Sequence, residues 1–393
     1  MTDMRIGTRI ATQRKIAGLT QVQFAQRSNY ALSTVRAVEQ GREPASAAFT
    51  SAAARVLKVE PEELTGAPYR ETIELDGPLE GMSDLRTVLT EGRYVGALEP
   101  TALDELSDEM DRINAAYRND KGRLALALLP TLIRQLHGAV REASTDEDRG
   151  RAYSLLSAAY VTAERLCRRF GFLQLCTPAI DQLEWVSDQA SDRLYVAQAK
   201  VKRARVLMYL GATDVSLSLV EQGLDDIVGD GEPAVAVRGY AHLAGAISAA
   251  RGQRPDVART HIAEAWNLAQ HMPGESDAYG TLFGAGNVGI HACAVELESG
   301  EPQRAAAEGS SLRLPAGIAP PRAGHHWQDT ARAWLLSGRP TEALSALNRA
   351  RKVAPQQTRL HPSVRETLQG IAEAERRKTD SLASFAGWVG MKV

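Results

Sequence analysis

The chain has 393 residues, of which 44% are hydrophobic and 24% are charged, and its formal net charge is −2. This composition is ordinary for a soluble globular protein of two or three domains. No apolar run approaches the ~20 residues that span a bilayer, the N-terminus lacks the apolar core of a signal peptide, and three scattered cysteines suit a reduced compartment. We therefore expect a cytoplasmic protein with no membrane partner. Few aromatic residues and abundant Ala and Leu favour an all-α fold.

The first sixty residues carry the clearest signal in the chain. Two short amphipathic patterns, residues 21–27 and 32–40, are separated by a tight turn of small and polar residues. This spacing lets one helix cross a phosphate backbone while the next lies in the major groove of DNA. Residues 1–59 hold nine basic residues against three acidic ones, a difference of +6, whereas the whole chain is slightly acidic. A basic head on a neutral-to-acidic body is typical of a protein that binds duplex DNA.

This segment resembles the XRE (lambda-repressor-like) helix-turn-helix family over about residues 6–66. The resemblance rests on LTQ at residues 19–21, EQG at residues 39–41 and VEPEEL at residues 59–64. It implies a five-helix lambda-repressor-like domain over residues 1–66. It also implies that Arg14 and Glu39 pair the first helix with the third.

The resemblance carries over the positions that contact DNA, which are Gln21, Leu32, Ser33, Thr34, Arg36, Ala37 and Arg42. Arg36 is the only strong hydrogen-bond donor on the base-reading face, and arginine is the commonest reader of guanine. The sequence departs from the family at Asn29, where the turn usually has Gly, and at Ala31, where the third helix usually has a Ser or Thr cap. Sequence discrimination is therefore expected to rest on few direct contacts. The alternative is a degenerate domain kept for dimerisation or protein contact.

Residues 67–81 contain two Pro and two Gly with weak periodicity, and we interpret them as a linker to a body of residues 82–393. From residue 82 onward the pattern is helical, with Gly, Pro, Asp and Ser between the segments. The predicted helices are residues 102–117, 123–143, 147–170, 173–189, 193–210, 215–228, 234–251, 257–271, 279–298 and 303–312.

Residues 324–355 closely match the 34-residue tetratricopeptide (TPR) repeat. The signature positions are occupied by Trp327, Ala331, Trp334, Gly338, Ala343, Leu347, Ala350 and Pro355. The small residues Ala331 and Ala343 let two antiparallel helices approach, and Gly338 and Pro340 make the turn between them. The unit recurs more weakly around Gly211, Gly252 and Gly300. The resemblance implies a TPR-like α-solenoid with a concave surface, followed by an apolar tail that either caps the last repeat or joins a second subunit.

The sequence offers no catalytic or metal-binding constellation. His325 and His326 are adjacent and so point to different faces of a helix, and no carboxylate or cysteine lies at ligand spacing. The acidic cluster at residues 104–111 is most simply a solvated helix face. We therefore expect no enzyme activity, no cofactor and no metal.

The concave face is the better place to look for a ligand. In a TPR the first helix of each repeat lines the concavity. Counting back from each turn glycine places Gln198, Lys202, Arg205, His242, Asn287, His291, His325, Gln328 and Arg332 on that face. Of these, the candidate effector-binding residues are Lys202, Arg205, His242, Asn287, His291, Gln328 and Arg332. An amide can hold a peptide backbone in both directions, and the basic side chains can hold a carboxylate.

A helix-turn-helix head joined to a TPR-like body resembles actinobacterial regulators of this layout and, more loosely, the RRNPP-type peptide sensors of Gram-positive bacteria. The resemblance implies a ligand-responsive transcription regulator. Its partners would be double-stranded DNA, a second copy of the chain in a homodimer, and a peptide or small-molecule effector of the kind used in quorum sensing. The alternative is a TPR scaffold that docks a protein partner, with DNA binding secondary. A groove closed at both ends would favour a small ligand, and an open one would favour a protein.

Overall fold

The computed structural model describes residues 5–66, 77–374 and 380–391, and within these ranges the chain is helical. The extended backbone pairs only at an isolated bridge between Ser276 and Phe283. The predicted all-α fold is therefore confirmed. Most of the predicted linker, residues 67–76, lies outside the described residues. In the described part, no helix is both long and apolar enough to cross a membrane.

The head consists of five short helices, as the sequence predicts. They are α1 (Ile6–Ile16), α2 (Gln21–Ser28), α3 (Leu32–Glu39), α4 (Ala47–Leu57) and α5 (Pro61–Thr65). Their core includes the fully buried side chains Ile10, Phe24, Phe49 and Leu64. Thr20 starts α2 through a reciprocal capping box with Gln23, and Asn29 ends it in the left-handed conformation, with φ 59°. Asn tolerates this conformation, so it replaces the usual Gly at little cost.

An ion pair between Arg14 and Glu39 joins α1 to the end of α3, as predicted. The Arg14 Nε and Nη2 atoms donate to the two Glu39 carboxylate oxygens at 2.6 and 2.9 Å, while Nη1 donates to the Leu19 carbonyl at 2.7 Å. The side chains are only 9% and 4% exposed. The Glu39 carboxylate, by this hydrogen bond, raises the pKa of Arg14. A two-pronged pair of this kind fixes orientation as well as distance.

The body begins with α7, α8 and α9 and continues as helix pairs to the C-terminus. The α-helices are α7 (Met82–Glu91), α8 (Leu103–Arg118), α9 (Gly122–Glu142), α10 (Asp146–Arg169), α11 (Cys176–Ser187), α12 (Leu194–Tyr209), α13 (Thr213–Asp225), α14 (Glu232–Arg251), α15 (Pro255–Ala269), α16 (Ala285–Glu298), α17 (Pro302–Ser311), α18 (Pro320–Leu336), α19 (Pro340–Val353), α20 (Pro355–Leu360), α21 (Pro362–Ala374) and α22 (Asp380–Trp388). Three 3₁₀ turns, η1 (Gly92–Tyr94), η2 (Leu173–Leu175) and η3 (Ala278–Gly280), lie between them.

The TPR-like repeat at α18 and α19 forms as predicted. Ala331 and Ala343 are fully buried where the two helices meet. Gly338 takes the left-handed conformation, with φ 74°, and Pro340 opens α19. Pro suits the first position of a helix because its missing N–H would have no partner there. The turn after α14 differs, since Gln253 rather than Gly252 takes the positive φ.

One predicted helix starts later than expected. The segment 279–298 was expected to be a single helix, but α16 begins only at Ala285. The preceding residues form η3 and the bridge that places the buried Phe283 ring against Gly239, where an added Cβ would lie 2.1 Å from the ring. The Glu275 carboxylate then accepts the Gly286 N–H at 2.6 Å. Long-range packing therefore overrides the local helical pattern.

The C-terminal helices cap the solenoid. Leu382, Phe385 and Val389 from the end of the chain are buried in one cluster with Val364 and Leu368 of α21. This cluster also includes side chains of α18 and α19, so α21 and α22 cover the exposed face of the last repeat.

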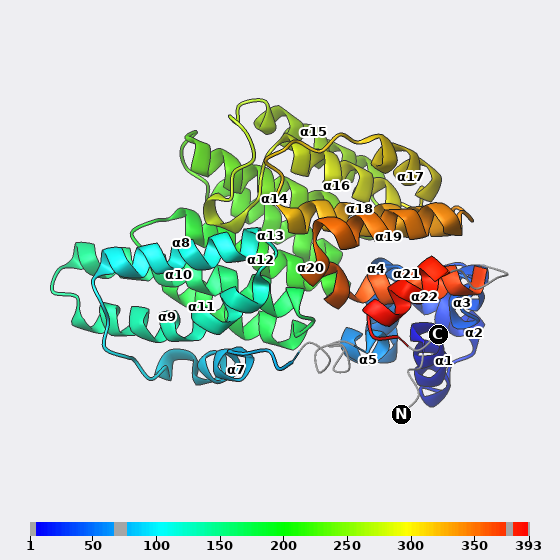
Figure 1. The fold of residues 1–393 in the computed structure, drawn as a ribbon, viewed down its shortest axis with the longest axis horizontal. Coiled ribbons are helices and arrows are strands. Elements are labelled where there is room, and N and C mark those ends of the chain that lie inside the picture. The colour runs from blue at the N-terminus through cyan, green and yellow to red at the C-terminus, as the bar shows by residue number, and fades with distance from the viewer. Residues whose placement is uncertain (1–4, 67–76, 375–379, 392–393) are drawn as a thin grey trace.

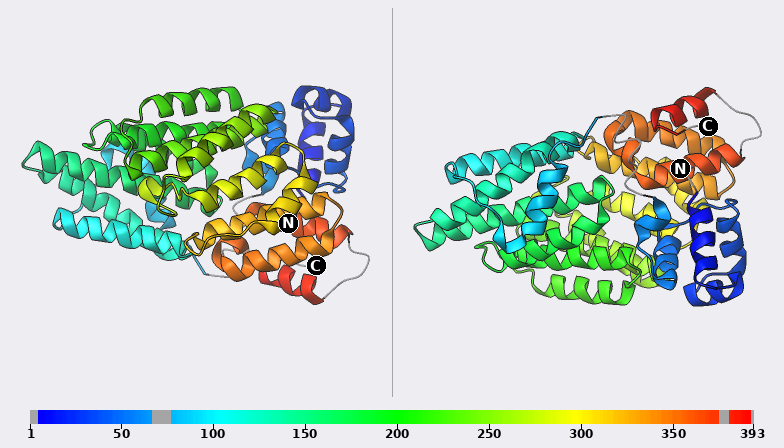
Figure 2. Two further views of the ribbon diagram at one scale, coloured as in Figure 1. Left: turned by 90° about the horizontal axis from the view of Figure 1, so that it is seen from above. Right: turned by 90° about the horizontal axis from the view of Figure 1, so that it is seen from below.

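The body curves until its first and last parts meet. The Asp120 carboxylate, between α8 and α9, accepts the backbone N–H groups of Gln356 and Gln357 in α20 at 2.8 and 3.1 Å. In return, the Gln356 side chain accepts the N–H of Arg123 at 3.0 Å. The head lies at one end of the body, beside the C-terminal helices α21 and α22 (Figure 1, Figure 2).

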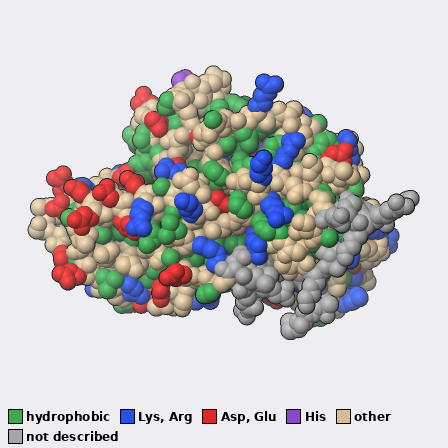
Figure 3. Space-filling model, viewed as in Figure 1, with side chains coloured by type: hydrophobic (Ala, Val, Ile, Leu, Met, Phe, Trp, Pro, Cys, Tyr) green, Lys and Arg blue, Asp and Glu red, His purple; other side chains and the backbone are tan. Residues whose placement is uncertain are grey.

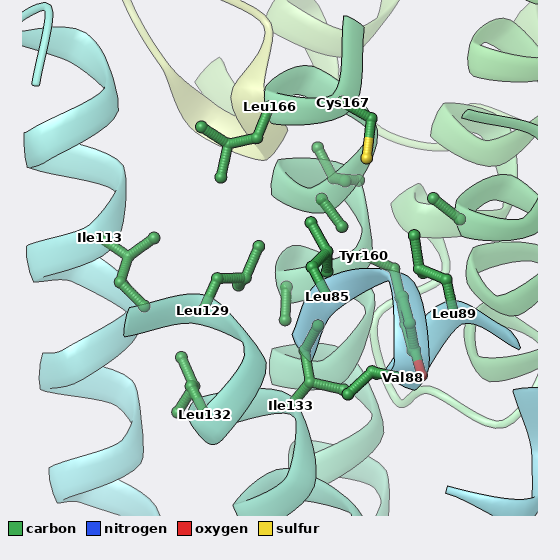
Figure 4. Packing of buried hydrophobic residues seen from close by; sticks show 14 of the residues in the cluster. Leu85, Val88, Leu89, Ile113, Leu129, Leu132, Ile133, Tyr160, Leu166 and Cys167 are labelled. Carbon is green, nitrogen blue, oxygen red and sulfur yellow. The ribbon is translucent and has the colours of Figure 1, made fainter. Parts of the chain in front are cut away.

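Acidic side chains gather at the end of the molecule far from the head (Figure 3). The exposed acids there include Asp104 and Glu105 at the start of α8 and Asp146 and Glu147 at the start of α10. The largest buried cluster lies in the same half of the body, where Leu85, Ile133 and Tyr160 pack between α7, α9 and α10 (Figure 4).

We expect Arg14→Met to destabilise the head by roughly 3 kcal/mol, because it leaves the buried Glu39 carboxylate without its cation. Hydrogen exchange of peptides from α1 and α3 measures this loss as reduced protection. Arg112→Met is the matched control, since Arg112 forms an exposed pair with Glu109 in α8. Unchanged protection of α1 and α3 in the Arg14 variant would contradict the role of this pair.

Candidate DNA-binding face and ligand cavity

The recognition helix α3 is partly exposed and partly turned toward the body. Val35 and Val38 face the core of the head, whereas Ser33 and Arg36 are exposed. Arg42, in the loop after α3, is exposed as well. The Arg36 side chain is therefore exposed and able to reach a base edge, which suits arginine as a reader of guanine.

Two of the predicted DNA-contact residues lie beside the ion pair or at the edge of the core. Gln21 donates to the Glu39 carboxylate at 2.8 Å, so its amide is held at the N-terminus of α2. That position suits contact with a phosphate, because helix N-termini attract anions. Leu32 is half-buried and packs against the core of the head.

The remaining two, Thr34 and Ala37, line a cleft of about 1060 Å³ between the head and the body. The opposite wall is made by the turns that follow α14, α16 and α18, with α21 at one end. Gln253, Gly300 and Gly338 mark these three turns. One flank of the recognition helix therefore faces protein.

Exposed polar contacts join the head to the body at the rim. Arg5 pairs with Glu373 of α21 at 2.5 Å, and Arg55 of α4 donates to the Gly211 carbonyl at 3.3 Å. Asn29 donates to the Gln253 side chain at 3.3 Å. Such exposed pairs contribute about 0–1 kcal/mol each.

A second cavity, of about 250 Å³, lies between the head and the concave face of the body. The head supplies one wall with mostly apolar and small side chains from α1, α4 and α5, such as Ile6, Ala47 and Pro61. The body supplies the other walls, mostly from one face of each first helix. The first helices contribute Arg205, Met208 and Tyr209 of α12; Leu243, Ala244, Ile247 and Arg251 of α14; Ile290, His291, Ala294 and Glu298 of α16; and Arg322, His325, Asp329 and Arg332 of α18. Two further segments of the body complete the walls, with Arg168, Gly171 and Leu173 at the end of α10 and just after it, and His361, Ser363, Glu366 and Thr367 at the start of α21. First helices therefore line the concavity, as predicted.

Two carboxylates hold most of the cations around this cavity. Glu298 accepts hydrogen bonds from Arg332 at 3.1 Å and Arg251 at 3.3 Å. Behind the wall, Glu164 accepts from Arg168 at 2.8 Å and from Lys202 at 2.9 Å. Burial alone would raise the pKa of Glu164, but Arg168 and Lys202 hold that pKa below its usual range.

The histidines at the cavity are neutral near pH 7. Burial, with the nearby Arg322 cation, lowers the pKa of His325 to about 3. Burial, with the neighbouring His325, also lowers the pKa of His361 to about 3. Within the described ranges, no three His, Cys, Asp or Glu side chains converge as a metal site would require.

The predicted effector residues divide into two groups. Arg205, His291 and Arg332 line the cavity. The other four do not line it and contact neighbouring side chains instead. Lys202 is 1% exposed and forms an ion pair with Glu164, and His242 contacts His261 at 3.0 Å. The Asn287 side-chain oxygen accepts a hydrogen bond from Arg322 at 2.9 Å, and the Gln328 amide donates to the Thr358 hydroxyl at 3.1 Å.

Sequence reasoning missed Arg322, Asp329 and Arg251 as cavity residues. On α18, residues 322, 325, 329 and 332 follow the spacing of one helix face. Applying this helical spacing backward from Arg332 in the sequence would have identified Arg322 and Asp329. Gln328 is one residue away from Asp329, and successive residues of a helix differ by about 100° around its axis. Its side chain therefore does not lie on the face that lines the cavity.

Residues 5–65 match a family model described as "Helix-turn-helix domain". Among curated proteins, no relative matches the chain.

Solved structures resemble the chain only distantly. BtubC (BKLC) from P. vanneervenii has 15% identity and a TM-score of 0.35, over 65% of this chain and 92% of its own. Bacillus thuringiensis PlcR, in complex with the peptide PapR7 and DNA, has 12% identity and a TM-score of 0.28, over 95% and 99%. The P58(IPK) TPR domain has 15% identity and a TM-score of 0.24, over 95% and 99%. TM-scores below 0.5 are too low to carry an argument about function.

The family match covers the same five helices as the XRE resemblance, from α1 to α5. The capped α2, the left-handed Asn29 and the Arg14–Glu39 pair are the structural features that the resemblance implies. The chain thus carries an N-terminal helix-turn-helix domain of the XRE-like kind, joined to an all-helical, TPR-like repeat body.

Proposed function

We propose that this protein is a ligand-responsive transcription regulator that acts in the cytoplasm. The head binds operator DNA, and the body controls whether the head is free to do so. The observation that carries this proposal is the position of α3, whose Thr34 and Ala37 face the cleft toward the body.

A docked head is expected to bind DNA poorly. A major groove is about 12 Å wide and 8.5 Å deep, so phosphate backbones flank an inserted helix on both sides. In the docked arrangement, one of these flanks is taken by the turns after α14, α16 and α18. DNA binding therefore requires the head to move away from the body, which breaks the exposed contacts at the rim.

The cavity supports control by a small ligand. It has walls from both the head and the body, so a ligand inside it contacts both at once. A ligand that binds the docked and released states unequally shifts the balance between them. Arg205, His291 and Arg332 remain the proposed effector contacts. The scaffold alternative is less favoured, because the head covers part of the concave face.

We also propose that the protein acts as a homodimer. A single helix-turn-helix head binds weakly, and two heads reading half-sites about one helical turn apart provide both affinity and specificity. Light scattering of the full chain at micromolar protein should give twice the monomer mass of 42.5 kDa. A monomer both with and without DNA would refute this part of the proposal.

Arg36→Ala should weaken binding to a duplex selected from a random library by about 1–3 kcal/mol, and weaken binding to random duplex much less. The reason is that a base contact is lost while phosphate contacts stay. Gel-shift titration at fixed salt measures both affinities. Equal losses on the two duplexes would show that Arg36 does not read bases.

Glu373→Ala removes the carboxylate that holds Arg5 and leaves the head itself unchanged. We expect tighter binding to the selected duplex by up to about fivefold, because an exposed pair contributes up to about 1 kcal/mol to docking. Glu342→Ala is the control, since it removes the same charge from an exposed pair with Arg339 on α19. Unchanged or weaker DNA binding by the Glu373 variant would contradict autoinhibition by docking.

A further inference from the structure

The cavity between the head and the body contains two arginines without a carboxylate partner. In the described part of the chain, Arg205 has a hydrogen bond to the Tyr240 hydroxyl at 2.9 Å, and Arg322 has hydrogen bonds to Asn287 at 2.9 Å and His291 at 3.3 Å. Neither has an acidic side chain at ion-pair distance. The Nε atom of Arg205 is buried and has no acceptor.

Two of the nearby carboxylates are already paired with cations. Glu298 holds Arg251 and Arg332, and Glu164 holds Arg168 and Lys202. Asp329 lies 3.4 Å from His325 and attracts Arg322 only at longer range.

Both guanidinium groups thus line the cavity half-buried and without a carboxylate at ion-pair distance, and the attraction of Glu164 for Arg205 and of Asp329 for Arg322 acts at longer range. Burial, together with repulsion from Arg205, lowers the pKa of Arg322 to about 10. Removing a cation from water without pairing it is costly. The two side chains line the same cavity from α12 and α18, which are far apart in the sequence.

The rest of the cavity wall is mostly apolar. Leu243, Ile247 and Ile290 of the body face Ile6 and Pro61 of the head. Ligand cavities of this type combine an apolar wall with a small number of polar groups that fix orientation. The volume of about 250 Å³ corresponds to roughly eight waters at ~30 Å³ each, which suits a small molecule better than an extended peptide.

We propose that the cavity binds a small amphiphilic anion, whose carboxylate or phosphate group lies between Arg205 and Arg322 and whose apolar part packs on Leu243, Ile247 and Ile290. Arginine is suited to this role because its planar fork donates two parallel hydrogen bonds to either anionic group. The regulatory role of this site rests on the proposed function, in which a ligand in the cavity controls docking of the head. The binding itself is independent of that response.

Titration calorimetry of the full chain tests the site with octanoate, octyl phosphate, octanol and acetate. We expect octanoate or octyl phosphate to bind, and whichever binds more tightly identifies the anionic group. Octanol lacks the charge and acetate lacks the apolar part, so each should bind at least tenfold more weakly. Equal binding of octanol or acetate, or no binding of either amphiphilic anion, would overturn the proposal.

Variants then locate the site. The double variant Arg205→Met with Arg322→Met should lose at least tenfold in affinity for the amphiphilic anion, whereas Arg112→Met, at an exposed pair in α8, should keep the full affinity. Wild-type affinity in the double variant would place the anion elsewhere. If the double variant does not fold, as judged by circular dichroism, the comparison of octanoate with octanol on the native chain still decides the proposal.

A DNA-binding readout separates this inference from the proposed function. If octanoate binds through Arg205 and Arg322 but leaves affinity for the selected duplex unchanged, the site stands and the ligand response fails. If no amphiphilic anion binds while Glu373→Ala tightens DNA binding, the anion site fails and control by docking stands.

Discussion

The closure of the solenoid at Asp120 is the constraint on which the rest of the arrangement depends. An open TPR array offers a long groove, but here the Asp120 carboxylate accepts two backbone N–H groups of α20. This contact joins the two ends of the curved body, which are more than 230 residues apart in the sequence. The head lies against this closed face and leaves two cavities between itself and the body. Buried carboxylate hydrogen bonds to backbone N–H groups are among the stronger polar contacts in proteins.

The proposed DNA-binding face and the proposed ligand cavity share one boundary, between the head and the body. Thr50 and Ser51 of α4 are almost fully buried at this boundary. The backbone of Ser51 lies against Gly211, where an added Cβ would be 3.5 Å away. On one side of this contact is the cavity with its two arginines, and on the other is the cleft next to α3. A change at either side therefore acts on the same docked state, which is the physical requirement for coupling two sites.

Local features of the fold could be predicted from the sequence, whereas long-range ones could not. The turn at Asn29 and the Arg14–Glu39 pair depend on residues within one small domain, and the family resemblance identified them. The prolines that open α15, α17 and α19 likewise mark helix starts by their own chemistry. The late start of α16 was missed because it depends on Phe283 packing against Gly239 in another repeat. The contact at Asp120 and the docking of the head join residues that are far apart in the sequence, so no periodic pattern in the sequence indicates them.

The candidate site shows the same division. The rule that first helices line the concavity holds, so Arg205, His291 and Arg332 were found. Lys202 was misleading because its charge is neutralised by Glu164 from α10, a contact that no spacing reveals. Gln328 and Asp329 differ by one position, and only the three-dimensional register decides which of them faces the cavity.

The most direct test of the account is the distance between the head and the body in solution. The three native cysteines are buried, so spin labels at Thr12→Cys in α1 and Asp256→Cys in α15 would report that distance by pulsed electron resonance. The account predicts one short, narrow distance distribution for the free protein and a longer, separate distribution when saturating duplex DNA is added. A single distribution that is unchanged by bound DNA would contradict it.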